Sequence, residues 1–339
     1  MSKRASDILK LVVFLGIGIF FIYWFLLKME PDQKRAVWEA FINANYWWVA
    51  LAMIVSLISH WLRALRWNLL YNAINISPNT NNTFGSVMVA YLANLAFPRL
   101  GEVARCATMR TSENIPIEKS LGTVVTERVI DVLMFVVIVV CSLLLMYGEI
   151  KDWLYNSLID KYESLPSVSV LLAIVVGLVV MTWGGYKLFW HKLLRFPIFQ
   201  KIDQFVHGCI EGFVSIFHLG RMSTIRFIIY SLLIYFLYIA GGLIIMQAFP
   251  ESKGLGLAAA FTLYLFGSIG MTFSQGGLGV YPVLVQMALS IYGVSVETGT
   301  AAGWLLWAAQ QAVVIVVGIG YLVYFSQTKK KNNTRQTTL

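Results

Sequence analysis

Long apolar segments alternate with short polar stretches along the chain. A helix needs about 20 apolar residues to cross the hydrocarbon core of a bilayer. Segments of roughly this length lie at residues 9–27, 47–65, 122–147, 168–189, 227–249 and 301–325. The pattern predicts an all-α, polytopic integral membrane protein with about six full spans. It also predicts a single transmembrane domain over residues 1–328, followed by a basic cytoplasmic tail over residues 329–339.

Two further apolar regions, residues 84–109 and 257–292, are interrupted before they reach a spanning length. Irregular backbone is tolerated at membrane depth only where protein or water covers it. We therefore expect each region to form a re-entrant helical hairpin, which enters the membrane and returns to the same side. The interrupting residues are Pro98 and Gly101 in the first region, and Gly276, Gly277 and Gly279 in the second.

The charge distribution orients these hairpins. The net charge is +9, and the basic residues flank the apolar segments, as the positive-inside rule expects. The rule places both termini and residues 187–226 in the cytoplasm, and the acid-rich residues 149–163 outside. Six spans with two re-entrant hairpins satisfy these signals together. The hairpins are then oppositely oriented and inverted-repeat-like, which is typical of transporter sites near the bilayer midplane.

Composition narrows the function classes. The chain is 58% hydrophobic and 13% charged, with a mean hydropathy of +0.71, unlike a soluble domain. The three cysteines are isolated and the four histidines follow no zinc-binding pattern, so the sequence predicts no metal and no cofactor. Basic residues that flank spans do not indicate a nucleic-acid partner. An enzyme is not favoured, because the sequence contains no nucleophile motif and no soluble catalytic domain.

Three groups of polar and glycine residues resemble the membrane domain of lysylphosphatidylglycerol synthase/flippase proteins. They are Asn94 with Pro98-Arg99-x-Gly101-Glu102-x-x-Arg105, then Glu127-Arg128-x-x-Asp131, then Gly276-Gly277-x-Gly279. The resemblance covers residues 47–324 and is to the stand-alone form, which lacks the synthase half. It implies a helical fold with re-entrant hairpins and the movement of a lipid between leaflets.

The sequence departs from the pattern of that family at two places. Tyr281-Pro282 stands where the family usually has an acidic residue. Gln310-Gln311 stands where the last span of the family often carries an arginine. These departures leave a lysyl-lipid substrate in question, whereas they do not affect the implied fold.

The residues at the two interruptions are the candidates for lipid binding. A guanidinium keeps its charge when it is desolvated, and its planar fork of donors matches a phosphate. Glycines allow close backbone approach, and helix N-termini can hold an anionic oxygen. We expect the lipid headgroup to bind at Arg99, Arg105, Arg128, Gly276, Gly277 and Gly279. The alternative for the arginines is an anchoring role at the level of the lipid headgroups.

A supporting polar network is expected around these residues. Its members are Asn94, Pro98, Gly101, Glu102, Glu127, Asp131, Ser274 and Gln275. We expect Glu102 to pair with Arg105, three residues later on one helix face, as a counter-ion or as a proton-coupling group. The alternative for Glu127, Arg128 and Asp131 is an interfacial cluster at the start of a helix.

Arg63 and Arg66 end the predicted second span, together with Trp61 and Trp67. We interpret this pair of arginines as residues that reach the headgroup level within an aromatic belt. His60 is interpreted as a helix-packing residue.

Intramembrane charges beside two opposed hairpins favour a transporter over an inert anchor. We hypothesise a flippase that moves an anionic phospholipid or a lipid-linked headgroup between the leaflets of a bacterial or archaeal cytoplasmic (inner) membrane. One alternative is a polytopic membrane glycosyltransferase, for which Glu30-Pro31-Asp32 would supply an acidic motif. Another is a membrane binding or regulatory subunit that transports nothing. The identity of the lipid, the direction of movement, the energy source and the oligomeric state stay open.

Overall fold

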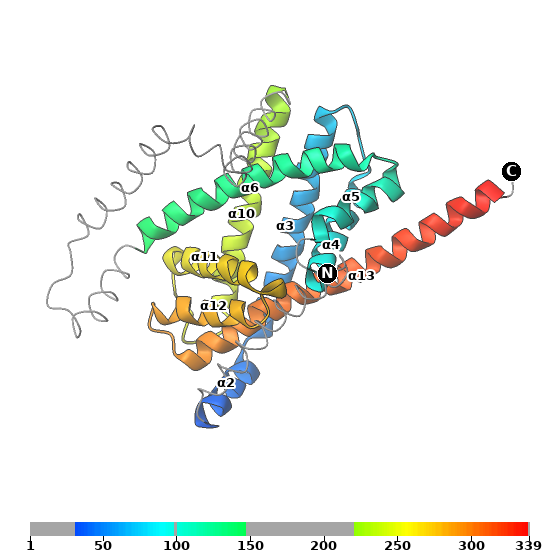
Figure 1. The fold of residues 1–339 in the computed structure, drawn as a ribbon. Coiled ribbons are helices and arrows are strands. Elements are labelled where there is room, and N and C mark those ends of the chain that lie inside the picture. The colour runs from blue at the N-terminus through cyan, green and yellow to red at the C-terminus, as the bar shows by residue number, and fades with distance from the viewer. Residues whose placement is uncertain (1–30, 98–99, 147–219, 338–339) are drawn as a thin grey trace, which may run out of the picture.

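The computed structural model describes residues 31–97, 100–146 and 220–337, and every regular element in these ranges is a helix. Figure 1 shows their arrangement. The elements are α2 (Pro31–Asn43), α3 (Tyr46–Ala73), α4 (Thr80–Ala96), α5 (Leu100–Glu113), α6 (Ile117–Leu145), α10 (Arg221–Met246), α11 (Leu257–Phe273), the 3-10 helix η1 (Gln275–Gly277), α12 (Val280–Ser290) and α13 (Val296–Thr337). The prediction of an all-α fold is confirmed for these ranges.

Some predicted features lie outside the described residues. They are the spans at 9–27 and 168–189, the acid-rich segment 149–163, residues 187–219 of the basic segment, and Pro98 and Arg99.

Four of the described helices, α3, α6, α10 and α13, are long and apolar enough to cross a membrane. They correspond to four of the predicted spans, so a polytopic membrane protein is supported. Helix α6 shows the pattern most clearly, because large apolar side chains are exposed along its length at Val125, Val132, Val136 and Val140. An exposed apolar face of this kind suits lipid rather than water.

Helices α3 and α6 are longer than the predicted spans. Hydrogen bonds between the two helices hold the additional turns: Trp67 Nε1 donates to Thr123 Oγ1 (2.9 Å), and the Tyr71 hydroxyl donates to Ser120 Oγ (2.8 Å). Polar residues in these turns therefore find partners inside the fold, so the helices continue where the apolar pattern alone would end them.

The two interrupted regions form two pairs of packed helices. Helices α4 and α5 make the first hairpin, and α11 and α12 make the second (Figure 1). Asn94 Oδ1 accepts the Gly101 N–H at 2.7 Å, which satisfies a free donor in the first turn of α5. Gly276, Gly277 and Gly279 turn the second hairpin with φ of 56°, 78° and 74°, a backbone region that favours glycine. The helix–break–helix pattern is confirmed, whereas its entry into a membrane stays a prediction.

Each hairpin has its own apolar core. One cluster of buried residues includes side chains of α11 and α12, and the other includes side chains of α4, α5 and α6. Helices α3, α10 and α13 contribute to both clusters. The three long helices therefore hold the hairpins in fixed positions, with their interrupted tips toward each other.

Candidate functional site

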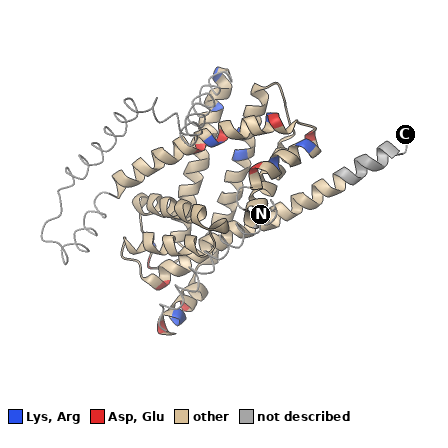
Figure 2. Cartoon of the chain, in the orientation of Figure 1, with Lys and Arg blue, Asp and Glu red and all other residues tan. Residues whose placement is uncertain are grey.

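Charged residues gather where α6 packs against α3 and α5 (Figure 2). Salt bridges connect the members of this group, which we call the ionic cluster: Arg63, Arg66, Glu102, Arg105, Glu127, Arg128 and Asp131. In contrast, α11, η1 and α12 contain no charged residue. Within the described residues, the buried ion pairs therefore lie beside the first hairpin and not the second.

Glu127 is the centre of the ionic cluster. Its carboxylate is fully buried and contacts three arginines: Arg66 Nη2 at 2.9 Å, Arg105 Nη1 at 2.7 Å and Arg63 Nε at 3.6 Å. A lone carboxylate in a desolvated position would be strongly unfavourable, so these three guanidinium groups are a condition for its burial. Through Arg105, Glu127 joins α6 to the first hairpin.

Asp131 lies one helical turn further along α6 and shares Arg63 and Arg66 with Glu127. Its carboxylate contacts Arg66 Nη2 at 2.8 Å, Arg63 Nη2 at 3.2 Å and Arg128 Nη1 at 3.2 Å. The Tyr235 hydroxyl of α10 donates to the backbone oxygen of Asp131 at 3.1 Å. The cluster thus connects α3, α5, α6 and α10.

The interpretation of Arg63 and Arg66 as headgroup-level anchors is wrong. Their exposed fractions are 7% and 0%, and the Arg66 guanidinium also lies 5.6 Å from the ring centre of Phe227. The physical reason is the length of α3, which places both arginines within the helix and opposite the carboxylates of α6. His60 is buried as expected, with its ring beside Tyr91.

The expected pair between Glu102 and Arg105 is also wrong. The Arg105 guanidinium binds Glu127 and stacks 4.4 Å from the ring centre of Trp67, whereas Glu102 faces Arg128 at 3.7 Å. Spacing along one helix allowed the pair, but a fully buried carboxylate on the neighbouring helix attracts the guanidinium more strongly because little water screens it. Glu127 and Asp131 also belong to this network, with Glu127 fully buried and 12% of the Asp131 side chain exposed, whereas their position relative to a membrane interface stays a prediction.

The ionic cluster has one more positive charge than negative. Four arginines face three carboxylates, so the formal sum is +1. Within the described residues, Arg105 Nε and Nη2 are buried and have no hydrogen-bond partner. Arg128 is the most accessible arginine of the group, with 44% of its side chain exposed. The cluster can therefore accept an additional anion.

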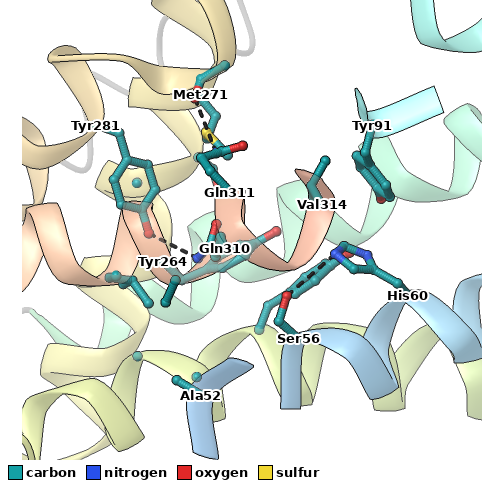
Figure 3. A pocket seen from close by; sticks show the side chains of 18 of the residues that line it. Ala52, Ser56, His60, Tyr91, Tyr264, Met271, Tyr281, Gln310, Gln311 and Val314 are labelled. Atoms are coloured by element: carbon teal, nitrogen blue, oxygen red, sulfur yellow. Dashed lines mark hydrogen bonds between the residues drawn. The ribbon is translucent and has the colours of Figure 1, made fainter. Parts of the chain in front are cut away.

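A cavity of about 560 Å³, here called the chamber, lies beside the ionic cluster. Its walls come from the tips of both hairpins and from α3, α10 and α13, and Figure 3 shows several of the side chains. The volume is typical of small-molecule sites, which measure about 300–1,000 Å³. Among the described residues that line it, Glu102 carries the only carboxylate, and none is an arginine or lysine. Tyrosine, serine and amide side chains supply most of its polar groups.

The tips of the two hairpins touch at one end of the chamber. Gln275 Nε2 donates to the backbone oxygens of Asn94 (3.2 Å) and Leu95 (2.9 Å). A Cβ at Gly276 would lie 2.6 Å from Leu95 Cδ2, so this contact leaves no room for a side chain. Trp307 Nε1 of α13 donates to the Gly276 oxygen at 2.8 Å. The predicted residues Asn94, Gln275 and Gly276 are thus brought together, although they lie far apart in the sequence.

The two departures from the family pattern meet inside the chamber. Gln310 Nε2 of α13 donates to the Tyr281 hydroxyl of α12 at 3.4 Å (Figure 3). Neighbouring Gln311 reaches the Gly276 oxygen, also at 3.4 Å. Uncharged groups therefore occupy the side of the chamber that the second hairpin forms.

The sequence patterns did not predict Arg63 and Arg66 as members of the ionic cluster, and they did not predict the tyrosines of the chamber. A signal for the arginines was present, because the apolar pattern of α3 resumes at Leu69 and Leu70, beyond both of them. No comparable signal marked the tyrosines, since three helices have to pack before Tyr238, Tyr264 and Tyr281 share one cavity.

The fold and the site define a class: multi-pass helical membrane proteins with two broken-helix hairpins around a central polar site. Within that class, the chain belongs to the family of the lysylphosphatidylglycerol synthase transmembrane region, which matches residues 8–318.

Two relatives are described as UPF0104 membrane proteins. The protein of Methanothermobacter thermautotrophicus is 23% identical over 94% of this chain and 96% of its own length. The protein of Methanocaldococcus jannaschii is 22% identical over 93% of this chain and 94% of its own length. No solved structure matches the chain.

Proposed function

We propose that this protein moves an anionic phospholipid, or a lipid-linked anionic headgroup, between the leaflets of a bacterial or archaeal cytoplasmic membrane. The observation that carries the proposal is the ionic cluster, with its excess positive charge, directly beside the chamber between the two hairpin tips. Buried charges in a membrane protein generally mark a substrate pathway. The description of the family names lysylphosphatidylglycerol, a phospholipid, which supports a lipid as the substrate.

In this proposal, the hairpins are re-entrant from opposite faces and the protein has six spans with both termini in the cytoplasm. The headgroup occupies the polar space between the tips, and the acyl or prenyl chain remains in lipid. Arg105 and Arg128 bind the phosphate, together with Arg99, and the glycine turn at residues 276–279 allows the headgroup to pass close to the backbone. Glu102 faces both the chamber and Arg128, which suits a counter-ion that is exchanged for the headgroup.

The proposed orientation can be tested with introduced cysteines, after alanine replaces the three native ones. Ser77 and Lys253 are exposed and lie in the α3–α4 and α10–α11 connections. Under the positive-inside assignment, Lys253→Cys reacts with an impermeant maleimide in intact cells, and Ser77→Cys reacts only after lysis. Labelling of both positions in intact cells, or the reverse pattern, would contradict the proposed topology.

Transport itself is tested with purified protein in liposomes that contain fluorescent phosphatidylglycerol in both leaflets. Dithionite, which cannot cross the bilayer, quenches half of the signal in protein-free vesicles and more when lipid exchanges between leaflets. Arg105→Gln should slow the exchange about tenfold or more, since it removes a charge-assisted contact of about 1.5–3 kcal/mol. Arg110→Gln is the matched control, because Arg110 lies on the same helix but is exposed and outside the cluster.

The same preparation separates the alternatives. Formation of a new glycolipid from a nucleotide sugar would indicate a glycosyltransferase. A rate of leaflet exchange equal to that of protein-free vesicles, across several anionic lipids, would leave a binding or regulatory subunit and would overturn the proposal.

A further inference from the structure

Buried polar atoms without a hydrogen-bond partner in the described residues lie on both sides of the candidate site, and Glu102 belongs to both sides. On the side of the ionic cluster, a small cavity of about 20 Å³ is lined by Arg63, Arg105 and Arg128. Tyr91, Asn94 and Glu102 line both this cavity and the chamber, so the two spaces share a wall. A headgroup at this shared wall can contact residues of both the small cavity and the chamber.

Among the buried atoms of the ionic cluster that have no hydrogen-bond partner in the described residues, four are donors and two, Glu102 Oε2 and Glu127 Oε2, are acceptors, of which Glu127 Oε2 lies 2.7 Å from Arg105 Nη1. Arg105 Nε and Nη2 and the Nε atoms of Arg63 and Arg66 are buried without a hydrogen-bond partner in the described residues, although Arg63 Nε lies 3.6 Å from Glu127 Oε1 and Arg66 lines neither cavity. A guanidinium has donors and no acceptor, so only an acceptor can complete these groups. A phosphate oxygen has that property, and its negative charge matches the +1 sum of the cluster.

The chamber contains acceptor atoms that have no hydrogen-bond partner among the described residues. Gln275 Oε1 and Glu102 Oε2 belong to residues that line it, and both are buried without a hydrogen-bond partner in the described part of the chain. The orientation of the Gln275 amide is fixed, because its nitrogen donates to two backbone oxygens. These two atoms are acceptors, so a ligand satisfies them only if it donates, whereas Ser274 Oγ and His60 Nδ1, which belong to chamber residues and also have no hydrogen-bond partner in the described part, can meet a ligand hydroxyl as donor or as acceptor.

Hydroxyl groups fit this requirement better than an amine does. The only carboxylate among the chamber residues, Glu102, already faces Arg128, and the excess positive charge of the cluster would repel an ammonium. Hydroxyls donate without carrying charge. Tyr238 and Tyr264, which line the chamber, stack with ring centres 5.9 Å apart and an interplanar angle of 11°. Aromatic walls with a few polar groups are suited to a ring-shaped ligand of mixed polarity.

We infer that the headgroup is a phosphorylated cyclic polyol, a sugar or an inositol, whose phosphate binds the ionic cluster and whose hydroxyls bind the chamber. This inference rests on the proposed function and specifies its substrate class. Two lipid sources share this chemistry: a phosphatidylinositol and a polyprenyl phosphosugar. A lipid with a bare phosphate would contact only the ionic cluster. An aminoacyl lipid would place a cation in the chamber.

The test is lipid binding to the full-length protein in nanodiscs of neutral lipid, measured by native mass spectrometry with one added lipid at a time. The probes are phosphatidylinositol, polyprenyl phosphomannose, phosphatidic acid and lysylphosphatidylglycerol. At least one of the two ring lipids should bind about tenfold more tightly than phosphatidic acid, which corresponds to about 1.4 kcal/mol. Whichever ring lipid binds more tightly identifies the source.

Two variants assign the preference to the two halves of the site. Glu102→Gln replaces an acceptor-only group in the chamber, so it should reduce the preference for a ring lipid while phosphatidic acid binds as before. Arg105→Gln should weaken the binding of all four lipids and leave the ratios of their affinities unchanged. The lipid series on the unmodified protein remains decisive even if a variant does not fold.

The outcomes separate this inference from the proposed function. Equal binding of phosphatidic acid and both ring lipids, or tightest binding of lysylphosphatidylglycerol, would overturn the polyol inference even if lipid still exchanges between leaflets. A clear preference for a ring lipid without any leaflet exchange would support the polyol site and overturn the transport proposal.

Discussion

The two hairpins have the same helix–break–helix plan, but different interactions stabilise them. A side chain caps the first: Asn94 accepts the Gly101 N–H, and Arg105 ties α5 to the buried Glu127. The second has no charged residue in its helices, and its turn relies on left-handed glycines and on Trp307, which donates to a backbone oxygen. The charged hairpin therefore depends on exact partners, whereas the neutral hairpin depends on backbone geometry and close packing.

The largest loss of stability is expected when Glu127, the centre of the ionic cluster beside the first hairpin, is replaced. Glu127→Gln leaves three buried arginines without their shared carboxylate, and removal of one partner of a buried ion pair costs about 3–5 kcal/mol. Thermal unfolding in detergent should shift strongly to lower temperature. Glu118→Gln is the control, because Glu118 is exposed on the same helix, and it should leave the unfolding midpoint unchanged. Equal midpoints for the two variants would show that the ionic cluster does not stabilise the fold.

A smaller loss of stability is expected when one glycine of each hairpin is replaced by alanine. A Cβ at Gly101 would lie 2.4 Å from the Ala90 oxygen, and a Cβ at Gly270 would lie 2.7 Å from Tyr281 Cα. Both neighbouring atoms belong to the backbone and cannot move away easily, so Gly101→Ala and Gly270→Ala should each destabilise the protein by about 1–3 kcal/mol.

Gly320→Ala provides the control for these two substitutions, because nothing lies within 4 Å of a Cβ at that position in α13. Alanine also favours a helix over glycine by about 1 kcal/mol, so this variant should be as stable as the original protein or more stable. If Gly101→Ala and Gly270→Ala behaved in the same way, the tight packing within the hairpins would be refuted.

The contrast between the hairpins also explains what could be predicted from the sequence. Helix length and the break at Gly276 are local properties, so the apolar pattern and helix-breaking residues were sufficient to predict them, whereas Gly101, also expected to interrupt a helix, lies in the first turn of α5. Ion-pair partners are not local. Glu102 and Arg105 had suitable spacing on one helix, but Trp67 and Glu127, from two other helices, decide where the arginine points.

The same reasoning applies to α3 and to the chamber. The position of Arg66 within its helix followed from the hydrogen bonds of later residues to α6, which no pattern along one chain segment reveals. The glycines at the second turn were expected at the site because they break a helix. The tyrosines of the chamber were not expected there, because the sequence pattern of an apolar helix does not distinguish a tyrosine that faces lipid from one that faces a cavity.

A third prediction concerns Arg128, where the effect of a substitution on stability should differ from its effect on lipid exchange. Arg128 is 44% exposed and pairs with Glu102 and Asp131 at 3.7 Å and 3.2 Å. Exposed pairs contribute at most about 1 kcal/mol, so Arg128→Gln should change the unfolding midpoint little. If Arg128 binds the headgroup, the same variant should clearly slow leaflet exchange in liposomes and weaken its dependence on salt. A normal exchange rate would remove Arg128 from the proposed headgroup site.

The smallest effect is expected on the neutral side, at the hydrogen bond between Tyr281 and Gln310. The contact is long, at 3.4 Å, and joins two uncharged groups, so Tyr281→Phe should cost only about 0.5–1.5 kcal/mol. Phenylalanine keeps the ring that packs against Gly267, which limits the change to the hydroxyl. Thermal unfolding of Tyr281→Phe, Gln310→Met and the double variant gives the coupling energy between the two residues. A coupling as large as the loss in Glu127→Gln would mean that the neutral hairpin also depends on exact side-chain partners, and the distinction between the two hairpins would have to be abandoned.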